Sequence, residues 1–466
     1  MMKKSICFII FFYFFSLLNA QNFQIDSIQV KKIYNEVLNN GNVYGNLRSL
    51  CKDVGHRLSG SNGAAKAVQW GKILLESYDL DNVWLQEVMV PHWDRGEVER
   101  LDFISNDNDI YRTNCTALGG SIGTDGEVLS GNVIEITSWD QMEQLGEEVL
   151  SGKLVFLNRP MNPSFITTFH AYGSCVDQRH QGAVQAAKYG AIGVIVRSMT
   201  LKFDNNPHTG SMSYIDGITK IPAVAISTVD AHNLSKLLKK DPNLTAKMKL
   251  SCKTLPDTLS YNVIGEIKGS TFPDQVIVVG GHLDSWDIGE GAHDDGAGVV
   301  HSIEVMSLFK KLGIQPKHTI RCILYMNEEN GNRGGKTYAS FVKKNGEKHI
   351  MAVESDRGGF SPRGFSVDGT AGQLAVVQSF ERLFEPYQLH IFKKGYGGVD
   401  IGPLKDGKIC LVGLVPDSQR YFDYHHAPTD VFENVNKREL ELGAAALTSF
   451  IFLIDKYGFQ QTEFNQ

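Results

Sequence analysis

The sequence predicts an α/β fold in which a mainly parallel or mixed sheet is flanked by helices and a smaller domain is inserted. Two observations support this prediction. From residue 261 onward, short apolar runs alternate with helical segments, and such runs are typical of strands that are buried on both faces of a largely parallel sheet. Between about residues 116 and 250, a compact strand–helix–strand alternation indicates a separate small domain.

The composition is that of an ordinary globular protein. The chain has 466 residues, enough for two domains, and 42% of them are hydrophobic and 21% charged. The formal net charge of -6 gives no reason to expect nucleic acid or an anionic membrane as a partner. Beyond the N-terminal segment the cysteines are sparse, so disulfide pairing stays open.

The N-terminus is typical of a secretory signal. Lys3 and Lys4 precede an apolar stretch over residues 6–18 that is too short to span a bilayer comfortably. We therefore expect residues 1–20 to be a signal peptide that is cut after Ala20. The mature chain would then be secreted, extracellular or periplasmic, with no stable membrane span. An anchor that is retained uncut is the alternative.

The N-terminal part of the main domain is expected over residues 21–115. Helical spacing covers 24–40 and 62–78, and strand-like alternation covers 83–90 and 97–104. Residues 21–40 are either a pro-segment or an N-terminal packing helix.

The insert is expected over residues 116–252. Its strands are expected at 153–158, 191–196 and 221–226, with a helix at 182–189, a loop at 203–220 and a return linker at 251–260. The rest of the main domain is expected over residues 253–466. Its strands are expected at 276–280, 320–326, 350–353 and 409–415, and its helices at 297–312, 335–344, 372–384 and 437–455.

Acidic and histidine residues stand near the ends of these apolar strands. They are His282, Asp284, Asp294, Asp295, Glu328, Glu329, Asp356, His425 and His426. Because ligands bind beyond the carboxyl ends of the strands in open α/β sheets, we expect these side chains to converge. Imidazole nitrogen and carboxylate oxygen are the ligands that zinc takes, so the pattern predicts a hydrolytic site with two metal ions.

Two neighbouring ions need one bridging carboxylate and separate terminal ligands. Asp294 can bridge, because one carboxylate has two oxygens. His282 and Asp356 could then complete one ion, and Glu329 and His426 the other. Each pair taken alone has an ordinary explanation, as a surface feature, a helix cap or a solvated turn. The combination, in this order and at strand ends, is what indicates a metal site.

Two further carboxylates suit supporting roles. Asp284 lies two residues after His282, so on a strand both side chains point the same way, and Asp284 could accept the second N–H of a ligating imidazole. Glu328 stands directly before the ligand Glu329 but is not assigned to a metal itself. It is therefore suited to act as a general base for water and later as an acid for the leaving amine. A partly apolar wall would be needed to raise its pKa beside two cations.

The motif order H-x-D, D-D-G-A-G, E-E, D and H-x-x-x-D resembles that of the di-zinc exopeptidases, a family that includes bacterial leucyl aminopeptidase and glutamate carboxypeptidase. Longer strings carry the resemblance over nearly the whole mature chain. They are G-G-H-L-D-S-W-D at 280–287, M-N-E-E-N-G at 326–331, E-S-D at 354–356 and Y-F-D-Y-H-H at 421–426. The segment 116–252 is similar to the protease-associated domain that one branch carries as an insert.

The resemblance implies a zinc-exopeptidase fold with two Zn²⁺ ions per chain. It implies Asp294 as the bridging ligand rather than Asp295, because in the family this residue stands four positions before a glycine, here Gly298. The implied ligands are His282, Asp294, Glu329, Asp356 and His426, with Glu328 as the base and Asp284 as the support of the site.

His426 is implied over His425 because Asp430 follows it at the family's interval, and Asp356 is implied over Glu354. The family often has Thr or Ser after this histidine, where the chain has Ala. The resemblance further implies a secreted exopeptidase that hydrolyses short unblocked peptides, above all dipeptides. Relatives suggest a homodimer, and the protease-associated domain is generally a lid or interaction module.

Two other functions stay open from the sequence. Glutaminyl cyclase chemistry uses the same architecture with one zinc, although a single ion would not need both ligand pairs. A binding ectodomain without catalysis would commonly lose a ligand or the base, and all are present. Arg333, Arg357 and Arg420 stand near the motifs and could bind a substrate carboxylate, or pair with structural carboxylates.

Overall fold

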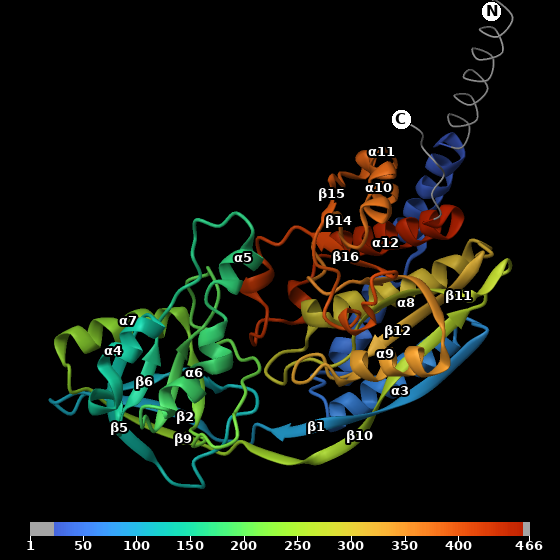
Figure 1. Ribbon diagram of the computed structural model, residues 1–466. Coiled ribbons are helices and arrows are strands. Elements are labelled where there is room, and N and C mark those ends of the chain that lie inside the picture. The colour runs from blue at the N-terminus through green and yellow to red at the C-terminus, as the bar shows by residue number, and fades with distance from the viewer. Residues whose placement is uncertain (1–22, 460–466) are drawn as a thin grey trace, which may run out of the picture.

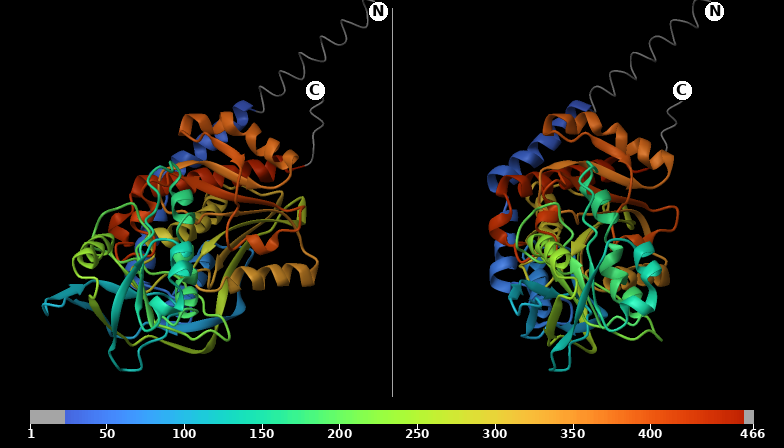
Figure 2. Two further views of the ribbon diagram at one scale, coloured as in Figure 1. Left: turned by 60° about the vertical axis from the view of Figure 1, so that its left-hand side comes forward. Right: turned by 90° about the vertical axis from the view of Figure 1, so that its left-hand side faces the viewer.

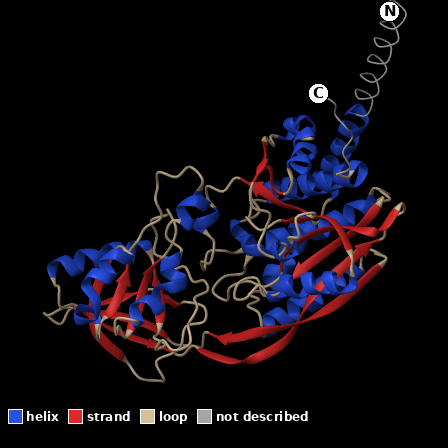
Figure 3. Cartoon of the chain, in the orientation of Figure 1, coloured by secondary structure: helices blue, strands red, loops and turns tan. Residues whose placement is uncertain are grey.

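The structure is a computed structural model that describes residues 23–459. Two units, each built on its own sheet, lie side by side and are joined by the long strands β1 and β10 along one edge (Figure 1). Figure 3 shows helices over both sheets. The signal peptide expected at residues 1–20 lies outside the described part of the chain.

The first unit contains an eight-stranded sheet in the order β1-β10-β12-β11-β13-β16-β14-β15. Its strands are β1 (Asn82–Asp94), β10 (Lys253–Ile267), β11 (Phe272–His282), β12 (His318–Tyr325), β13 (Lys348–Glu354), β14 (Pro362–Asp368), β15 (Ile391–Lys394) and β16 (Cys410–Pro416). The central strands β12, β11, β13 and β16 are parallel, whereas β10 pairs antiparallel with β1 and β12, and β14 pairs antiparallel with β16 and parallel with β15. This mixed sheet confirms the predicted fold class.

Helices cover both faces of this sheet, as the views in Figure 2 also show. They are α2 (Val43–Ser49), α3 (Asn62–Glu76), α8 (Ala297–Lys311), α9 (Arg333–Asn345), α10 (Ala371–Ser379), α11 (Glu381–Phe384) and α12 (Lys437–Tyr457). Alternate residues of β11 point to opposite faces. Ile277 and Val279 pack in the core with α8 and α12, and Val276 and Val278 pack in the core with Tyr338 of α9. Burial on both faces explains the continuous apolar runs.

An N-terminal helix covers residues 23–40. Val30, Ile33 and Tyr34 are buried in the same core as α8 and α12. Asp26 forms an ion pair with Lys456 near the end of α12. Removal of this helix would expose that apolar surface to water, at a cost of about 25 cal/mol per Å². The burial therefore favours a packing helix over a pro-segment.

The second unit contains an eight-stranded sheet in the order β3-β2-β9-β5-β6-β7-β8-β4. Its strands are β2 (Glu99–Ile104), β3 (Ile110–Thr113), β4 (Cys115–Ala117), β5 (Leu129–Ile136), β6 (Leu154–Leu157), β7 (Gly193–Arg197), β8 (Ala223–Ile226) and β9 (Thr245–Leu250). Its helices are α4 (Trp139–Leu150), α5 (Thr168–Gly173), α6 (Asp177–Ala187) and α7 (Thr228–Lys240).

The boundaries of the second unit differ from the expected range 116–252. Strand β2 pairs antiparallel with β9, so the unit already includes residue 99. The expected linker at 251–260 is largely strand, because β10 begins at Lys253 and pairs with β1. Strand-like alternation was visible at residues 97–104, but the local pattern of a strand does not specify which sheet it joins.

Among residues 23–459, no helix has both the length and the apolar character that crossing a membrane requires.

Candidate metal centre

The strands of the first unit bring the candidate residues together at one edge. His282 ends β11 and is in register with Tyr325, which ends the parallel strand β12. On the other side of β11, Gly280 is in register with Glu354 at the end of β13. The segments after these strands, which carry the E-E and E-S-D motifs, therefore leave the sheet beside His282.

Two glycines allow the D-D-G-A-G segment to approach β11 closely. A Cβ atom at Gly281 would lie 2.4 Å from Oδ2 of Asp295, and one at Gly298 would lie 1.7 Å from the carbonyl oxygen of Ser355. In this position Asp295 accepts the backbone N–H of His282 at 3.1 Å and that of Gly298 at 2.9 Å. Asp295 therefore holds the backbone, and the carboxylate of Asp294 is left for the site.

The five expected ligands converge in two groups that share Asp294. In one group, Nε2 of His282 lies 3.2 Å from Oδ1 of Asp294 and 3.5 Å from Oδ1 of Asp356. In the other, Nε2 of His426 lies 3.3 Å from Oδ2 of Asp294 and 3.1 Å from Oε2 of Glu329. The two oxygens of Asp294 thus face different groups, as a bridging carboxylate requires.

These distances fit zinc. With metal–ligand bonds of 2.0–2.2 Å, the ligand atoms of a tetrahedral ion lie about 3.3–3.6 Å apart. In addition, Asp294 Oδ2, Glu329 Oε1 and Asp356 Oδ1 are buried without a hydrogen-bond partner among the described residues. Buried carboxylate oxygens are normally paired, so these three are the atoms that a bound cation would satisfy.

The geometry also separates neighbouring candidates. Glu354 accepts the backbone N–H groups of Val399 at 2.8 Å and Ile401 at 2.9 Å, so both of its oxygens are engaged. His425 stacks on the ring of His426, with centroids 3.6 Å apart, and its Nε2 lies 3.7 Å from Asp294. His425 and Asp294 could also hold a cation together with His426, but only His426 faces Glu329.

Asp430, four residues after His426 in the H-x-x-x-D motif, has a structural role. Its two carboxylate oxygens accept the backbone N–H groups of His293 at 2.7 Å and Asp294 at 3.1 Å. The turn that carries His426 is therefore tied to the segment that carries the shared ligand.

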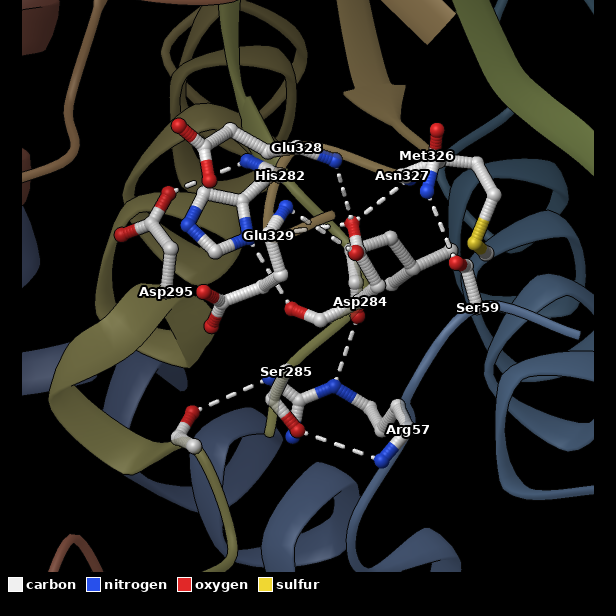
Figure 4. Close-up of polar contacts among 12 residues, drawn as sticks. Arg57, Ser59, His282, Asp284, Ser285, Asp295, Met326, Asn327, Glu328 and Glu329 are labelled. Atoms are coloured by element: carbon white, nitrogen blue, oxygen red, sulfur yellow. Dashed lines mark hydrogen bonds and ion pairs between the residues drawn. The ribbon is translucent and has the colours of Figure 1, made fainter. Parts of the chain in front are cut away.

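Asp284 supports the site differently from the expectation. Its carboxylate accepts the backbone N–H groups of Asn327, Glu328 and Glu329, at 2.7, 3.0 and 3.3 Å (Figure 4). Nδ1 of His282 lies 3.0 Å from the backbone carbonyl oxygen of Asp284 and 3.8 Å from its carboxylate. The carbonyl therefore orients the imidazole. The carboxylate instead accepts three backbone N–H groups of the E-E turn and thereby fixes the turn.

Arg57 is a structural residue of the site that the sequence analysis missed. It is fully buried and donates to the carbonyl oxygens of Leu283 at 2.7 Å, Glu290 at 2.6 Å and Gly291 at 3.0 Å (Figure 4). It thus holds the loop between His282 and Asp294. A lone arginine far upstream carries no local signal of such a contact.

The pKa values of Glu328 and Asp294 are shifted in opposite directions. Burial raises the pKa of Glu328 well above its ordinary value, and the charges of Asp356 and Glu329 add to the rise. Burial also acts to raise the pKa of Asp294. The close imidazoles of His282 and His426 outweigh burial and hold that pKa well below its ordinary value. Asp294 is thus an anion suited to cations, whereas Glu328 is poised to take up a proton.

The second unit reaches the site through Arg179 on α6. Its Nη1 lies 3.3 Å from Nδ1 of His426 and its Nη2 3.3 Å from Nε2 of His180. Arg179 is buried, at 4% exposure, yet it has no carboxylate partner among residues 23–459. A buried cation without an anion is unusual, so Arg179 has binding capacity to spare.

The arginines named from the sequence are engaged elsewhere. Arg333 forms an ion pair with Asp257, and Arg420 with Glu439. Arg357 donates to Ser366 Oγ at 3.2 Å and to the carbonyl oxygen of Tyr396 at 3.0 Å. Arg179 also donates from Nε to the carbonyl oxygen of Ser211 at 3.3 Å, and what sets it apart is that Nη1 faces the candidate ligand His426.

The second unit also supports the turn at His425 and His426. The N–H of Thr209 donates to the carbonyl oxygen of His426 at 2.9 Å, and Nδ1 of His208 lies 2.8 Å from that of His425. Tyr172 of α5 stands edge-on to the ring of His425, with centroids 5.2 Å apart. The site is therefore built by both units, although all five candidate ligands come from the first.

Comparison with known proteins gives three informative results. The sequence profile described as peptidase family M28 matches residues 262–451, the part that holds every candidate ligand. The chain is similar to carboxypeptidase Q from Homo sapiens, with 35% identity over 410 residues, 88% of this chain and 84% of that protein. The crystal structure of a peptidase M28 precursor from Shewanella amazonensis superposes with a TM-score of 0.88 and 33% identity, covering 93% of this chain and 97% of that chain.

A zinc aminopeptidase from Bacillus subtilis shares the fold. Its structure has a TM-score of 0.64 and 20% sequence identity, and the match covers 88% of this chain and 94% of that chain.

Proposed function

Because the chain belongs to peptidase family M28 and is a zinc metallopeptidase, we propose that it is an exopeptidase that hydrolyses short unblocked peptides, above all dipeptides, with two zinc ions. The family membership confirms the resemblance predicted from the motifs, including the likeness to carboxypeptidase Q. The observation that carries the proposal is the placement of Asp294, whose two oxygens face His282 and His426 separately.

Each residue of the cluster has a chemical task in this proposal. His282 and Asp356 would hold one ion, Glu329 and His426 the other, and Asp294 both. When bound, the ions supply positive charge that polarises the scissile carbonyl and acidifies water.

Glu328 acts as the general base. It takes a proton from the attacking water and returns it to the departing amine. Its burial supports this role, because a raised pKa makes the carboxylate a stronger base and the carboxylic acid a competent donor. Asp284 fixes the backbone of Glu328 through the hydrogen bond at 3.0 Å, so the base has a defined position.

Arg179 would bind the terminal carboxylate of the substrate. If Nε2 of His426 ligates an ion, its proton resides on Nδ1, which then cannot accept a hydrogen bond from Arg179. The guanidinium facing Nδ1 at 3.3 Å then needs another acceptor, and a carboxylate matches its planar donor fork. A carboxylate so close to the ligands would be the C-terminus of the residue that leaves, which is the arrangement in a dipeptide.

The remaining features of the proposal rest on the sequence. The second unit is proposed to be a protease-associated domain, and the signal-like residues 1–20 to direct secretion or export to the periplasm. A homodimer is proposed from the family resemblance alone.

A panel of substrates tests the activity. Unblocked dipeptides, N-blocked dipeptides and amino-acid amides are incubated with the purified protein, with and without a chelator. Cleavage of unblocked dipeptides that the chelator abolishes is the expected result. Cleavage of blocked but not amidated substrates would indicate strict carboxypeptidase action. No cleavage of any peptide, with cyclisation of N-terminal glutamine instead, would replace the proposal by the one-zinc cyclase alternative.

A further inference from the structure

We propose that Trp286 donates its indole N–H to an oxygen of the substrate at the reacting centre, and is thus a further catalytic residue. The proposal rests on the peptidase function proposed above. Trp286 belongs to the string G-G-H-L-D-S-W-D, four residues after the ligand His282.

The indole N–H of Trp286 is buried and unpaired. Trp286 is 3% exposed, and its Nε1 has no hydrogen-bond partner among the described residues. By contrast, the indole N–H groups of Trp70, Trp93 and Trp139 donate to oxygens at 2.9, 2.9 and 2.6 Å. Leaving a buried donor unpaired costs about 1–3 kcal/mol, so an exception calls for an acceptor from outside the chain.

Trp286 borders the metal ligands. It lines a cavity of about 10 Å³ together with Asp294, Glu329 and His426. Its ring stands edge-on to that of His426, with centroids 5.8 Å apart. A cavity of this size has room for about one small atom or molecule. Trp286 therefore lies beside the candidate ligands of one of the two proposed ions.

The second unit fixes the position of the indole. A Cβ atom at Gly119 would lie 1.8 Å from Cη2 and 2.2 Å from Cζ3 of Trp286, so the six-membered ring abuts bare backbone. The N–H belongs to the other ring, at the end away from this contact. The backbone N–H of Gly119 donates to the carbonyl oxygen of Gly210 at 2.9 Å, which stabilises the wall behind the indole. The donor is thus preorganised rather than mobile.

The chemistry of the surroundings selects the acceptor. The nearby carboxylates of Asp294 and Glu329 do not accept from Trp286 and are suited to cations. The remaining acceptor for the Trp286 N–H is an oxygen of the bound substrate. The scissile carbonyl oxygen gains negative charge as water attacks. A fixed N–H donor stabilises this charged oxygen in the transition state more than it stabilises the neutral carbonyl oxygen of the ground state.

A matched pair of variants tests the role. Trp286→Phe keeps an aromatic ring but removes the N–H, and Trp93→Phe does the same at a buried site where the N–H is paired with Ser121. We expect Trp286→Phe to lower kcat on a dipeptide by about tenfold or more while KM stays within about twofold, and to leave Tm unchanged or raised. Trp93→Phe should lower Tm and leave kcat unchanged.

Indole resonances provide a readout without turnover. The chain has 5 tryptophans, so ¹⁵N-tryptophan labelling gives a simple spectrum in which Trp286→Phe assigns the relevant peak. The N–H resonance of Trp286 should move downfield when a phosphinic dipeptide analogue is added to zinc-loaded protein, and that of Trp93 should not move. Movement on zinc loading alone would show that water, not substrate, is the acceptor, and would overturn the proposal.

The outcomes separate this proposal from the function on which it rests. Unchanged kcat in Trp286→Phe, or a loss of Tm as large as in Trp93→Phe, would refute the role of the indole while peptidase activity stands. Absence of dipeptide hydrolysis by the wild-type protein would instead refute the proposed function.

Discussion

Nη1 of Arg179, on a helix of the second unit, lies 3.3 Å from Nδ1 of His426, on a turn of the first. This contact joins a predicted metal ligand to a buried cation that has no acidic partner in the described chain. The second unit is therefore part of the wall of the site, and its removal would leave both the His425–His426 turn and the carboxylate-binding capacity incomplete.

Arg179→Met should raise KM for unblocked dipeptides by about 10- to 100-fold, because a charge-assisted hydrogen bond contributes about 1.5–3 kcal/mol. Amidated substrates lack the carboxylate and should be affected much less. Arg159→Met is the control, since Arg159 lies on the same unit and is paired with Asp177. Equal losses for acid and amide substrates in Arg179→Met would contradict carboxylate binding.

Glu328→Gln should retain metal but lose about 10²–10⁴-fold or more in kcat, since the amide cannot accept the proton of water. Metal content by elemental analysis and kcat on a dipeptide check this together. Glu329→Gln is the comparison, because it should weaken metal binding itself. Normal turnover by Glu328→Gln would remove Glu328 from the mechanism.

Purified active protein should contain two zinc ions per chain. Asp294→Ala should lose both, since its two oxygens face both groups, whereas His426→Ala should retain one. Elemental analysis after dialysis measures the stoichiometry. One ion per fully active wild-type chain would contradict a shared carboxylate and revive the one-zinc cyclase alternative.

The stability of the protein should fall as pH rises from about 4.5 to about 7 through one buried acid. Glu304 on α8 is fully buried and has no ion-pair partner among residues 23–459, and burial raises its pKa from 4.5 to about 7. The folded state then holds a proton that the unfolded state releases above its own pKa, so ionisation favours unfolding. The loss is about 3 kcal/mol and is complete above about pH 7.

Glu304→Gln should remove this dependence and stabilise the protein at pH 8 relative to pH 4.5. Denaturant unfolding at several pH values measures the difference between variant and wild type. Lys311, Glu36 and Glu441 also act on Glu304, with the lysine lowering and the acids raising its pKa. Glu76→Gln, at a more exposed position on α3, is the control. Parallel curves for Glu304→Gln and wild type would contradict the assignment.

The convergence of the candidate ligands was predictable because they follow strands of one sheet at the same edge. His282 and Asp356 follow adjacent parallel strands, so their proximity follows from topology. The choice of Asp294 over Asp295 needed the family spacing, and the structure supplies a physical reason, since Asp295 holds the backbone of Gly298.

Contacts between the two units were not predictable. Arg179 lies on a helix with ordinary amphipathic spacing, and its approach to His426 depends on how two separately folded sheets are docked. For the same reason the sequence did not place β2 in the second unit. The alternation of apolar and polar residues along β2 is compatible with either sheet. The Asp284 carboxylate was expected to accept the second N–H of the His282 imidazole. It binds three backbone N–H groups instead, and these are brought together only when the E-E turn folds.

The pairing of Asp26 with Lys456 has a practical consequence for engineering. It places the two ends of the described chain next to each other, on the side of the first unit away from the second (Figure 1). A short connection between residues 23 and 459, with new ends opened in the exposed loop between β2 and β3, gives a circular permutant whose candidate metal centre is untouched. Such a permutant would present the second unit as a terminal handle for immobilisation.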